Sequence, residues 1–226
     1  MARTKSRFVC QECGYVASSW LGRCPECGGW NTLVEEAEVT AKASKSYLPA
    51  NNEKLRPRTI ASVAQTKVER LATGIREFDR VLGGGVVPGS LVLLGGTPGI
   101  GKSTILLDAG LRFGQQGIKV LYVSGEESEE QTAMRAVRLG GAQSNDNLLI
   151  LTATDLDAIL AQANALKPQL LIIDSIQTMY NPELQTAAGS VGQVRECTAK
   201  LLQFAKSTGI AVLLIGHVTK DGTIAG

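Results

Sequence analysis

The sequence predicts an α/β protein in which helices flank a mainly parallel sheet, with a small four-cysteine module before it. Three observations carry this prediction. A glycine-rich motif of the form G-x-x-x-x-G-K-[ST] occupies 96–103, between an apolar run and a helical pattern. Apolar runs and helical patterns alternate after it, and two Cys-x-x-Cys pairs stand near the start. Such alternation favours a parallel sheet, because a helix returns the chain to the same edge of the sheet after each strand.

Length and composition set the domain organisation. A chain of 226 residues is long enough for one large domain and a smaller one. We expect the small module at 1–34 and the α/β domain at 58–226. The intervening segment at 35–57 is rich in Glu, Lys, Ala and Ser without a period, which is typical of a linker. With 23 Lys and Arg against 21 Asp and Glu, no global charge favours a nucleic acid, so any such contact must be local.

Hydropathy predicts the cellular compartment. No apolar run approaches the roughly 18 residues of a membrane span, so no membrane contact is expected. The basic start at 1–7 is followed by cysteines and polar residues instead of an apolar segment, which argues against a secretory signal. We therefore expect a cytoplasmic protein. In that reducing compartment, the five cysteines are expected to be metal ligands or core residues.

The two cysteine pairs predict a structural zinc ribbon. A glycine follows each pair and permits the tight turn that brings both sulfurs to one side of the ion. Four thiolates would close the tetrahedral shell of Zn²⁺, so no chemistry is expected at the metal. Two disulfides or redox dithiols are the alternatives. The predicted ligands are Cys10, Cys13, Cys24 and Cys27.

Three aromatic residues lie within this module. We expect Tyr15, Trp20 and Trp30 to form its small apolar cover. If their side chains were exposed instead, they would suit stacking on nucleic-acid bases or docking of a partner.

The glycine-rich motif predicts an ATP site. The apolar run at 90–94 is the expected strand that delivers the loop, and 102–116 is the expected helix that receives it. Backbone N–H groups would bind the phosphates, Lys102 would reach the β- and γ-phosphates, and the Ser103 hydroxyl would hold Mg²⁺. An ordinary glycine-rich turn is the alternative. The predicted nucleotide-binding residues of this segment are Gly95, Gly96, Thr97, Pro98, Gly99, Ile100, Gly101, Lys102, Ser103 and Thr104.

A short helix is expected before the loop. Thr73 is its predicted N-cap, and the triple glycine at 83–85 ends it. It would present Ile75, Phe78 and Leu82 to the core.

The second half of the domain supplies a further acid. Asp174 ends an apolar run in which an unpaired charge would be costly, so we expect it to bind the Mg²⁺ of the nucleotide. On the last predicted helix, Cys197 falls on the apolar face and is expected to be a core residue. Strands are predicted at 119–124, 147–151, 169–175 and 210–216, and helices at 125–139, 155–166 and 190–208.

Other polar residues also follow predicted strands. Glu126 and Glu127 come after the strand at 119–124, at the edge where ligands bind in open α/β sheets, although acids in a first helical turn are the alternative. His217 is the single histidine and is either structural or a sensor of the γ-phosphate. Lys220 is a candidate for contact with DNA or with a neighbouring subunit's nucleotide.

The segment at 176–189 has no clear period and follows a predicted catalytic strand, so we expect a mobile loop. It carries almost no positive charge, so its residues do not indicate contact with phosphates. Its polar side chains include Gln177, Thr178, Tyr180 and Gln185.

Taken in order, the motifs resemble those of the bacterial RadA (Sms) family of DNA-repair proteins, which have a RecA-like P-loop NTPase core. The resemblance rests on the cysteine pairs and on T-G-I-x-E-F-D-R-V-L-G-G-G, G-G-x-P-G-I-G-K-S-T, Y-V-S-G-E-E-S, L-I-I-D-S-I-Q-T and G-H-V-T-K-D-G-T-I-A-G. It implies a RecA-like ATPase domain at 58–226 in which Glu126, with Glu127 as substitute, activates the attacking water. Lys102 and His217 would complete the catalytic set.

The resemblance also implies partners. Family members would bind single-stranded or branched DNA, form hexameric rings, hydrolyse ATP to promote branch migration or strand exchange, and cooperate with a recombinase or replicative helicase. The family continues beyond the last motif found here, so we expect this chain to be an N-terminal portion. A regulatory ATPase similar to KaiC, or a fragment that binds nucleotide without turnover, are the alternative functions.

Overall fold

The computed structural model describes residues 6–37, 59–64, 68–141, 146–184 and 186–218. Residues 35–37 of the linker predicted at 35–57 continue a strand, and the rest of that segment, like Gln185 and Lys220 with their predicted roles, lies outside the described residues. Within them, no helix is long and apolar enough to cross a membrane.

The N-terminal module is a three-stranded antiparallel sheet. Strands β1 (Ser6–Cys10), β2 (Val16–Ala17) and β3 (Leu33–Ala37) lie in the order β2-β1-β3. Its buried interior is small and includes two of the predicted metal ligands. The residues that form it are Cys10, Ala17, Cys24 and Leu33, with Phe8 and Tyr15 packed partly against them.

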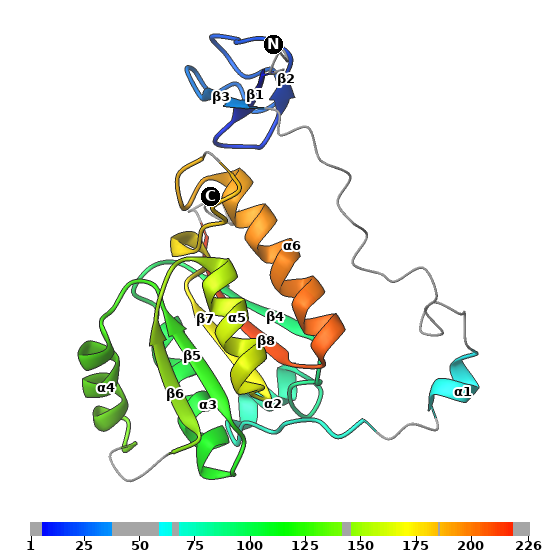
Figure 1. Ribbon diagram of the computed structural model, residues 1–226, viewed down its shortest axis with the longest axis vertical. Helices are drawn as coiled ribbons and strands as arrows, with labels where there is room; N and C mark the ends of the chain where they lie inside the picture. Colours follow the sequence, from blue (N-terminus) through cyan, green and yellow to red (C-terminus); the bar gives the residue numbers. More distant parts are fainter. Residues whose placement is uncertain (1–5, 38–58, 65–67, 142–145, 185, 219–226) are drawn as a thin grey trace.

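The second region is a five-stranded parallel sheet between two layers of helices (Figure 1). Its strand order is β4-β8-β7-β5-β6, and the helix between β7 and β8 crosses over to place β8 between β7 and β4. The strands are β4 (Leu91–Gly96), β5 (Val120–Ser124), β6 (Leu148–Thr152), β7 (Leu170–Asp174) and β8 (Ala211–His217). The helices are α1 (Ile60–Ala64), α2 (Arg76–Val81), α3 (Lys102–Gln115), α4 (Glu129–Arg138), α5 (Leu156–Leu166) and α6 (Val191–Thr208).

Each face of this sheet has its own hydrophobic cluster, because successive side chains of a strand point to opposite faces. Leu121 and Val123 of β5 face α5 and α6, whereas Val120 and Tyr122 face α3 and α4. Strand β7 alternates in the same way and is buried along its whole length. The parallel sheet predicted from the alternating pattern is therefore confirmed, and it is held by burial on both sides.

Local capping explains where most of the helices begin. Ser128 and Gln131 form a reciprocal capping box at the start of α4, so this helix begins after Glu126 and Glu127 and not at 125. The side chains of Asp155 and Ser190 accept N–H bonds at the starts of α5 and α6. These three polar residues satisfy backbone donors that the first turn leaves without a partner.

The predicted N-cap at Thr73 is wrong. Helix α2 begins at Arg76, and Ile75 precedes it without a side-chain cap. Thr73 instead donates from its N–H and its hydroxyl to Asp79 Oδ1, both at 2.8 Å. The Asp79 carboxylate also accepts from the N–H of Gly74 at 3.0 Å, so an acid from within the helix reaches back to organise the turn before it. The expected packing of Ile75, Phe78 and Leu82 against the core is confirmed.

The segment after β7 is more ordered than the sequence predicts. It opens with the short 3-10 helix η2 (Ile176–Thr178), and its Met179 is buried in the core. The Gln193 side chain of α6 accepts from Asn181 N–H at 2.8 Å and donates to Asn181 O at 3.2 Å. These buried contacts anchor the described part of the segment to α6, so the expectation of a mobile loop is wrong there.

The fifth cysteine is a core residue, as predicted. Cys197 lies on the buried face of α6 in the cluster between α5, α6 and the sheet. Burial raises the pKa of its thiol to about 11, which keeps the thiol protonated at neutral pH.

Candidate functional site

The carboxyl ends of four strands bring the predicted site residues together. Gly96 pairs with His217 where β4 and β8 end, and Ser124 pairs with Asp174 where β5 and β7 end. Glu126 follows β5 by two residues. This edge of a parallel sheet is where ligands bind in open α/β folds.

The phosphate-binding motif forms the turn between β4 and α3. Gly99 and Gly101 adopt φ values of 79° and 98°, in the left-handed region that favours glycine. Gly101 directly precedes Lys102, the first residue of α3. The loop therefore leads into the N-terminus of a 14-residue helix, where unpaired N–H groups and the helix dipole favour an anion.

Lys102 holds its ammonium group inside this loop. The residue is only 6% exposed, and its Nζ donates to Gly96 O at 2.8 Å and to Thr97 O at 2.9 Å. The same Nζ lies 3.2 Å from His217 Nδ1. The structure thus brings together two residues that are 115 positions apart, at the place where the motif expects phosphate.

Ser103 and Asp174 form the second contact of the site. The Ser103 hydroxyl donates to Asp174 Oδ1 at 3.1 Å, and the buried Tyr122 hydroxyl donates to Asp174 Oδ2 at 2.6 Å. A hydroxyl and a carboxylate at a helix N-terminus are oxygen ligands of the kind Mg²⁺ takes when it accompanies a triphosphate. The chemistry of this pair therefore fits a magnesium-nucleotide complex.

Glu126 contacts residues at the carboxyl ends of both β7 and β8. Ser175 donates from its hydroxyl to Glu126 Oε1 at 2.7 Å, and His217 Nε2 lies 3.3 Å from the same oxygen. Burial raises the pKa of Glu126, but the hydrogen bonds with Ser175 and His217 lower it by more, so the pKa of this carboxyl group lies below its ordinary value. Glu126 is therefore an ionised acceptor at neutral pH.

Glu127 has a different environment. Its carboxylate forms an ion pair with Arg135 of α4, and its backbone N–H donates to Ser124 Oγ at 3.0 Å. The alternative that both glutamates are first-turn acids is wrong, because those positions are held by Glu129 and Glu130. Of the two glutamates, only Glu126 contacts the residues around Lys102.

Sequence reasoning assigned no role at the site to four residues that organise this edge. Gln177 accepts from His217 N–H at 3.2 Å and donates to His217 O at 3.4 Å, which ties η2 to the end of β8. The others are Tyr122, Arg135 and Ser175, described above. Only Ser175 carried a local signal, because it adjoins Asp174 in the L-I-I-D-S motif. Tyr122 and Arg135 occupy positions that the strand and helix periods explain by packing alone.

The four cysteines of the N-terminal module converge as predicted. Their sulfur atoms all lie within 4.8 Å of one another, with Cys10 Sγ 3.7 Å from Cys27 Sγ and Cys13 Sγ 3.5 Å from Cys24 Sγ. A regular tetrahedron with Zn–S bonds of about 2.3 Å needs S···S separations of about 3.8 Å. The arrangement therefore fits a closed four-thiolate zinc site.

Two symmetric turns build this metal centre. Gly14 donates its N–H to Cys10 O, and Gly28 donates to Cys24 O, both at 2.9 Å. Both glycines have φ near 75°, at 76° and 74°, as the sequence predicts for the residue after each pair. Burial raises the pKa of Cys10, but hydrogen bonds from Thr32 and from the backbone of Cys13 and Glu12 lower it to about 6. The surroundings thus favour the thiolate at Cys10, whereas burial and the neighbouring thiols raise the pKa of Cys13 and bring that of Cys27 to about 12, so a bound cation is what would keep all four sulfurs deprotonated.

The prediction that the tryptophans cover this module is wrong. Trp20 is 55% exposed and Trp30 is 71% exposed, and only Tyr15 packs partly against the interior. Arg23 lies over the Trp30 ring, 5.7 Å from its centroid. The physical reason is that the converging sulfurs occupy the centre of the module, so its interior has no need of a large aromatic group.

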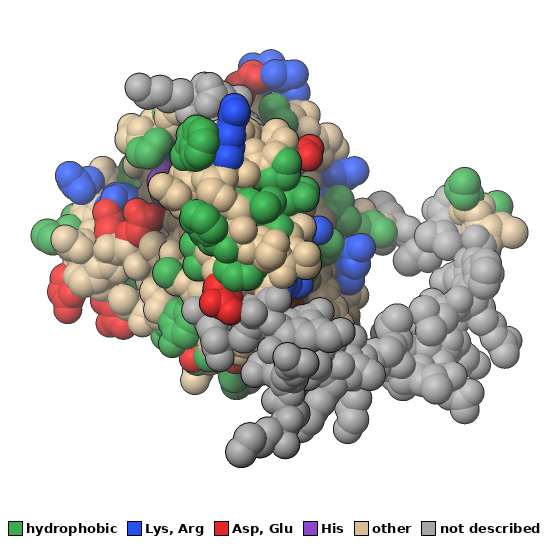
Figure 2. Space-filling model, turned by 90° about the horizontal axis from the view of Figure 1, so that it is seen from above, with side chains coloured by type: hydrophobic (Ala, Val, Ile, Leu, Met, Phe, Trp, Pro, Cys, Tyr) green, Lys and Arg blue, Asp and Glu red, His purple; other side chains and the backbone are tan. Residues whose placement is uncertain are grey.

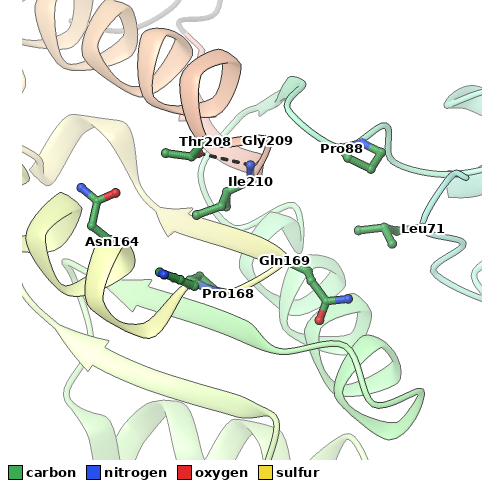
Figure 3. A pocket seen from close by; sticks show the side chains of 9 residues that line it. Leu71, Pro88, Asn164, Pro168, Gln169, Thr208, Gly209 and Ile210 are labelled. Atoms are coloured by element: carbon green, nitrogen blue, oxygen red, sulfur yellow. Dashed lines mark hydrogen bonds between the residues drawn. The ribbon is translucent and has the colours of Figure 1, made fainter. Parts of the chain in front are cut away.

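A pocket of about 430 Å³ lies at the amino ends of the strands of the parallel sheet (Figure 3). Gln169 and Ile210, which precede β7 and β8, line it together with Pro88 and Pro168. The Ile210 N–H donates to Thr208 Oγ1 at 3.2 Å in its wall. Because the amino ends of the strands form this pocket, it is separate from the edge that carries Lys102 and Asp174.

Comparison with known proteins agrees with the two sites. A protein-family model described as "AAA domain" matches residues 55–223, and one described as "Rubredoxin metal binding domain" matches residues 8–35. The chain is 50% identical to DNA repair protein RadA of Halalkalibacterium halodurans over 227 aligned residues, which cover 100% of this chain and 49% of that protein. It is 48% identical to proteins of the same name from Bacillus subtilis and Listeria monocytogenes, again over 100% of this chain and 49% of each relative.

The chain thus spans about half the length of these curated relatives. The matched AAA domain contains the whole phosphate loop and the strands that end at Asp174 and His217. The matched metal-binding domain contains all four converging cysteines. The chain therefore belongs to the AAA domain family, as a member that carries a zinc ribbon and is similar along its whole length to DNA repair proteins named RadA.

Proposed function

We propose that this chain binds ATP with Mg²⁺ and hydrolyses it as the motor of a DNA-repair protein. The observation that carries the proposal is the convergence of Lys102, Asp174 and Glu126 at one edge of the sheet, with His217 between the lysine and the glutamate. A cation, a metal-binding acid and an ionised acceptor are the three groups that phosphoryl transfer to water requires. The RadA relatives support the assignment to DNA repair.

Each group has a defined task in this proposal. Lys102 neutralises the β- and γ-phosphates, and the N–H groups at the start of α3 bind the phosphate oxygens. Ser103 and Asp174 hold the magnesium ion, which neutralises the charge that develops on the phosphate oxygens. The residue pair already shares a hydrogen bond, so it needs little rearrangement to face one ligand.

Glu126 is the proposed general base. It accepts a proton from the attacking water as the oxygen–γ-phosphorus bond forms and the bond from γ-phosphorus to the bridging oxygen breaks. Ser175 and His217 hold the carboxylate at the site, and His217 in turn contacts Lys102. We propose that loss of the γ-phosphate is sensed through this contact and passed to Gln177 on η2.

The DNA partner follows from the relatives and not from surface charge. Lysine and arginine side chains are scattered over the visible face in Figure 2, without a continuous basic area. We propose that binding of single-stranded or branched DNA, hexameric ring assembly, and branch migration or strand exchange belong to the whole protein of which RadA relatives are examples. A recombinase or replicative helicase would be the protein partner.

Substitution of the loop lysine tests the function. Lys102→Ala should abolish ATP hydrolysis and its stimulation by single-stranded DNA, because the phosphates lose their buried cation. The matched control is Lys206→Ala, since Lys206 is exposed on the last turn of α6. Hydrolysis and binding of a fluorescent ATP analogue are measured separately. Binding without any turnover by the unsubstituted protein would reject the motor and support a nucleotide-binding module, and indifference to DNA would reject the DNA-dependent motor.

The two glutamates provide a second test. Glu126→Gln should lower the hydrolysis rate about 10²- to 10⁴-fold with nucleotide binding retained, because the general base is lost. Glu127→Gln should have a much smaller effect, since Glu127 pairs with Arg135 away from the lysine. The reverse order of effects would assign the base to Glu127.

A further inference from the structure

Tyr122 occupies an unusual position for a core aromatic residue. It lies on β5, is 1% exposed, and packs in the hydrophobic cluster between the sheet and α3. Its hydroxyl group nevertheless reaches the carboxyl edge and donates to Asp174 Oδ2 at 2.6 Å. A phenylalanine would fill the same cluster without a buried polar group, so packing does not explain the choice of tyrosine.

The two oxygens of Asp174 have separate partners. Ser103 contacts Oδ1 from the first turn of α3, and Tyr122 contacts Oδ2 from the neighbouring strand. Strands β5 and β7 are paired in register, with Tyr122 opposite Ile172 and Ser124 opposite Asp174. Tyr122 and Asp174 therefore lie on the same face of the sheet, offset by two residues, and the phenol reaches across this offset. The bond from a rigid strand therefore fixes the plane of the carboxylate and leaves Oδ1 directed at Ser103.

The phenol can only donate in this contact. A carboxylate offers only acceptor atoms, so the phenol hydroxyl supplies the proton of the 2.6 Å bond to Asp174 Oδ2.

We propose that Tyr122 is a positioning residue for the magnesium-nucleotide complex, which it serves by orienting the Asp174 carboxylate. The inference rests on the proposed role of Asp174 and adds a residue to that site. Partners that orient a metal-binding carboxylate typically account for a 10- to 100-fold difference in metal affinity when they are removed. The contact of Tyr122 with Asp174 is of this kind.

The test is Tyr122→Phe, which keeps the ring and removes only the hydroxyl. Binding of a fluorescent ATP analogue is titrated over Mg²⁺ concentration in the absence of DNA. The concentration of Mg²⁺ at half-saturation should rise about tenfold, whereas binding measured with EDTA in place of Mg²⁺ should not change. Tyr180→Phe is the matched control, since it removes the same hydroxyl from a tyrosine outside the contacts of Asp174.

A second variant separates the inference from the proposed function. Asp174→Asn should raise the Mg²⁺ requirement by itself, and adding Tyr122→Phe to it should cause little further change, because both act through one carboxylate. If Asp174→Asn left the Mg²⁺ requirement unchanged, the proposed metal role would fail. If Asp174→Asn raised it but Tyr122→Phe did not, or if Tyr122→Phe lowered only the melting temperature, Tyr122 would be a packing residue and the inference would be overturned.

Discussion

The zinc ribbon and the AAA domain solve the problem of a stable interior in opposite ways. The ribbon buries few apolar side chains, and two of its buried residues are the metal ligands Cys10 and Cys24. The AAA domain buries β5 and β7 along their whole length and has a cluster on each face of its sheet. The difference teaches that a metal in the centre of a small module replaces the core and leaves even tryptophans exposed.

Metal removal should give the largest difference between the two regions. Chelation should unfold the ribbon, because binding of structural zinc supplies about 10 to 16 kcal/mol in peptides of this size, whereas the AAA domain should keep its structure. The Cys24→Ser variant should have the same effect, and Cys197→Ala should leave metal content unchanged because Cys197 lies in the core of the other region. Metal analysis and amide NMR spectra measure both. A ribbon that stayed folded after chelation would mean that its apolar residues suffice.

Truncating a buried side chain beside the parallel sheet should destabilise the AAA domain and leave the ribbon unaffected. Phe113→Ala removes a fully buried ring from α3 and should lower the free energy of unfolding of the AAA domain by about 3 to 5 kcal/mol. Metal content should be unchanged. Leu202→Ala is the control, since Leu202 is an exposed residue of α6 and should cost about 0.5 kcal/mol or less. Urea denaturation followed by circular dichroism reports the change, and loss of metal together with loss of domain stability would show that the regions depend on each other.

Acid should reveal a smaller contribution from the site itself. The folded-state pKa of Glu126 is lowered, so its carboxylate stabilises the fold above the pKa of the unfolded chain, and this contribution disappears as the pH falls through the folded value. Glu126→Gln should therefore lower stability at pH 7 by less than about 1 kcal/mol, because the group is partly exposed, and the difference should shrink as the pH falls below the ordinary carboxyl range toward the lowered folded-state pKa. Denaturation midpoints of both proteins from pH 7 to pH 3.5 check the direction. A difference that grew toward acid pH would contradict the assigned shift.

The comparison also separates what sequence patterns can predict from what they cannot. The phosphate loop, its strand and its helix follow from adjacent residues, and the strand that ends at Asp174 follows from its apolar run. Capping by Ser128 and Asp155 is equally local. Most elements of the AAA domain are therefore predicted by short local signals, with the turn at Thr73 and the segment after Asp174 as the exceptions.

Contacts between distant elements are not available from such signals. The bond between Tyr122 and Asp174 depends on which strands are neighbours, and the pairing of Gln193 with Asn181 depends on how α6 returns to the sheet. The Thr73 prediction failed because its hydroxyl accepts from Ile75 N–H, one residue before α2 begins, and donates to Asp79 Oδ1, which organises the turn. In the ribbon, periodicity predicts burial only where apolar packing is the source of stability, so the exposure of Trp30 was not predictable from its hydrophobicity.

A similarly small expected effect tests that last point within the ribbon. Trp30→Ala should change metal retention and ribbon stability by only about 0.5 to 1 kcal/mol, the value of an exposed cation–π contact such as that with Arg23. Leu33→Ala is the matched comparison, because Leu33 is buried beside the sulfurs and its truncation should cost more. Competition for zinc with a chromogenic chelator measures both variants. If Trp30→Ala released the metal as readily as Leu33→Ala, the indole would be part of the interior after all, and the metal could not be said to replace the core.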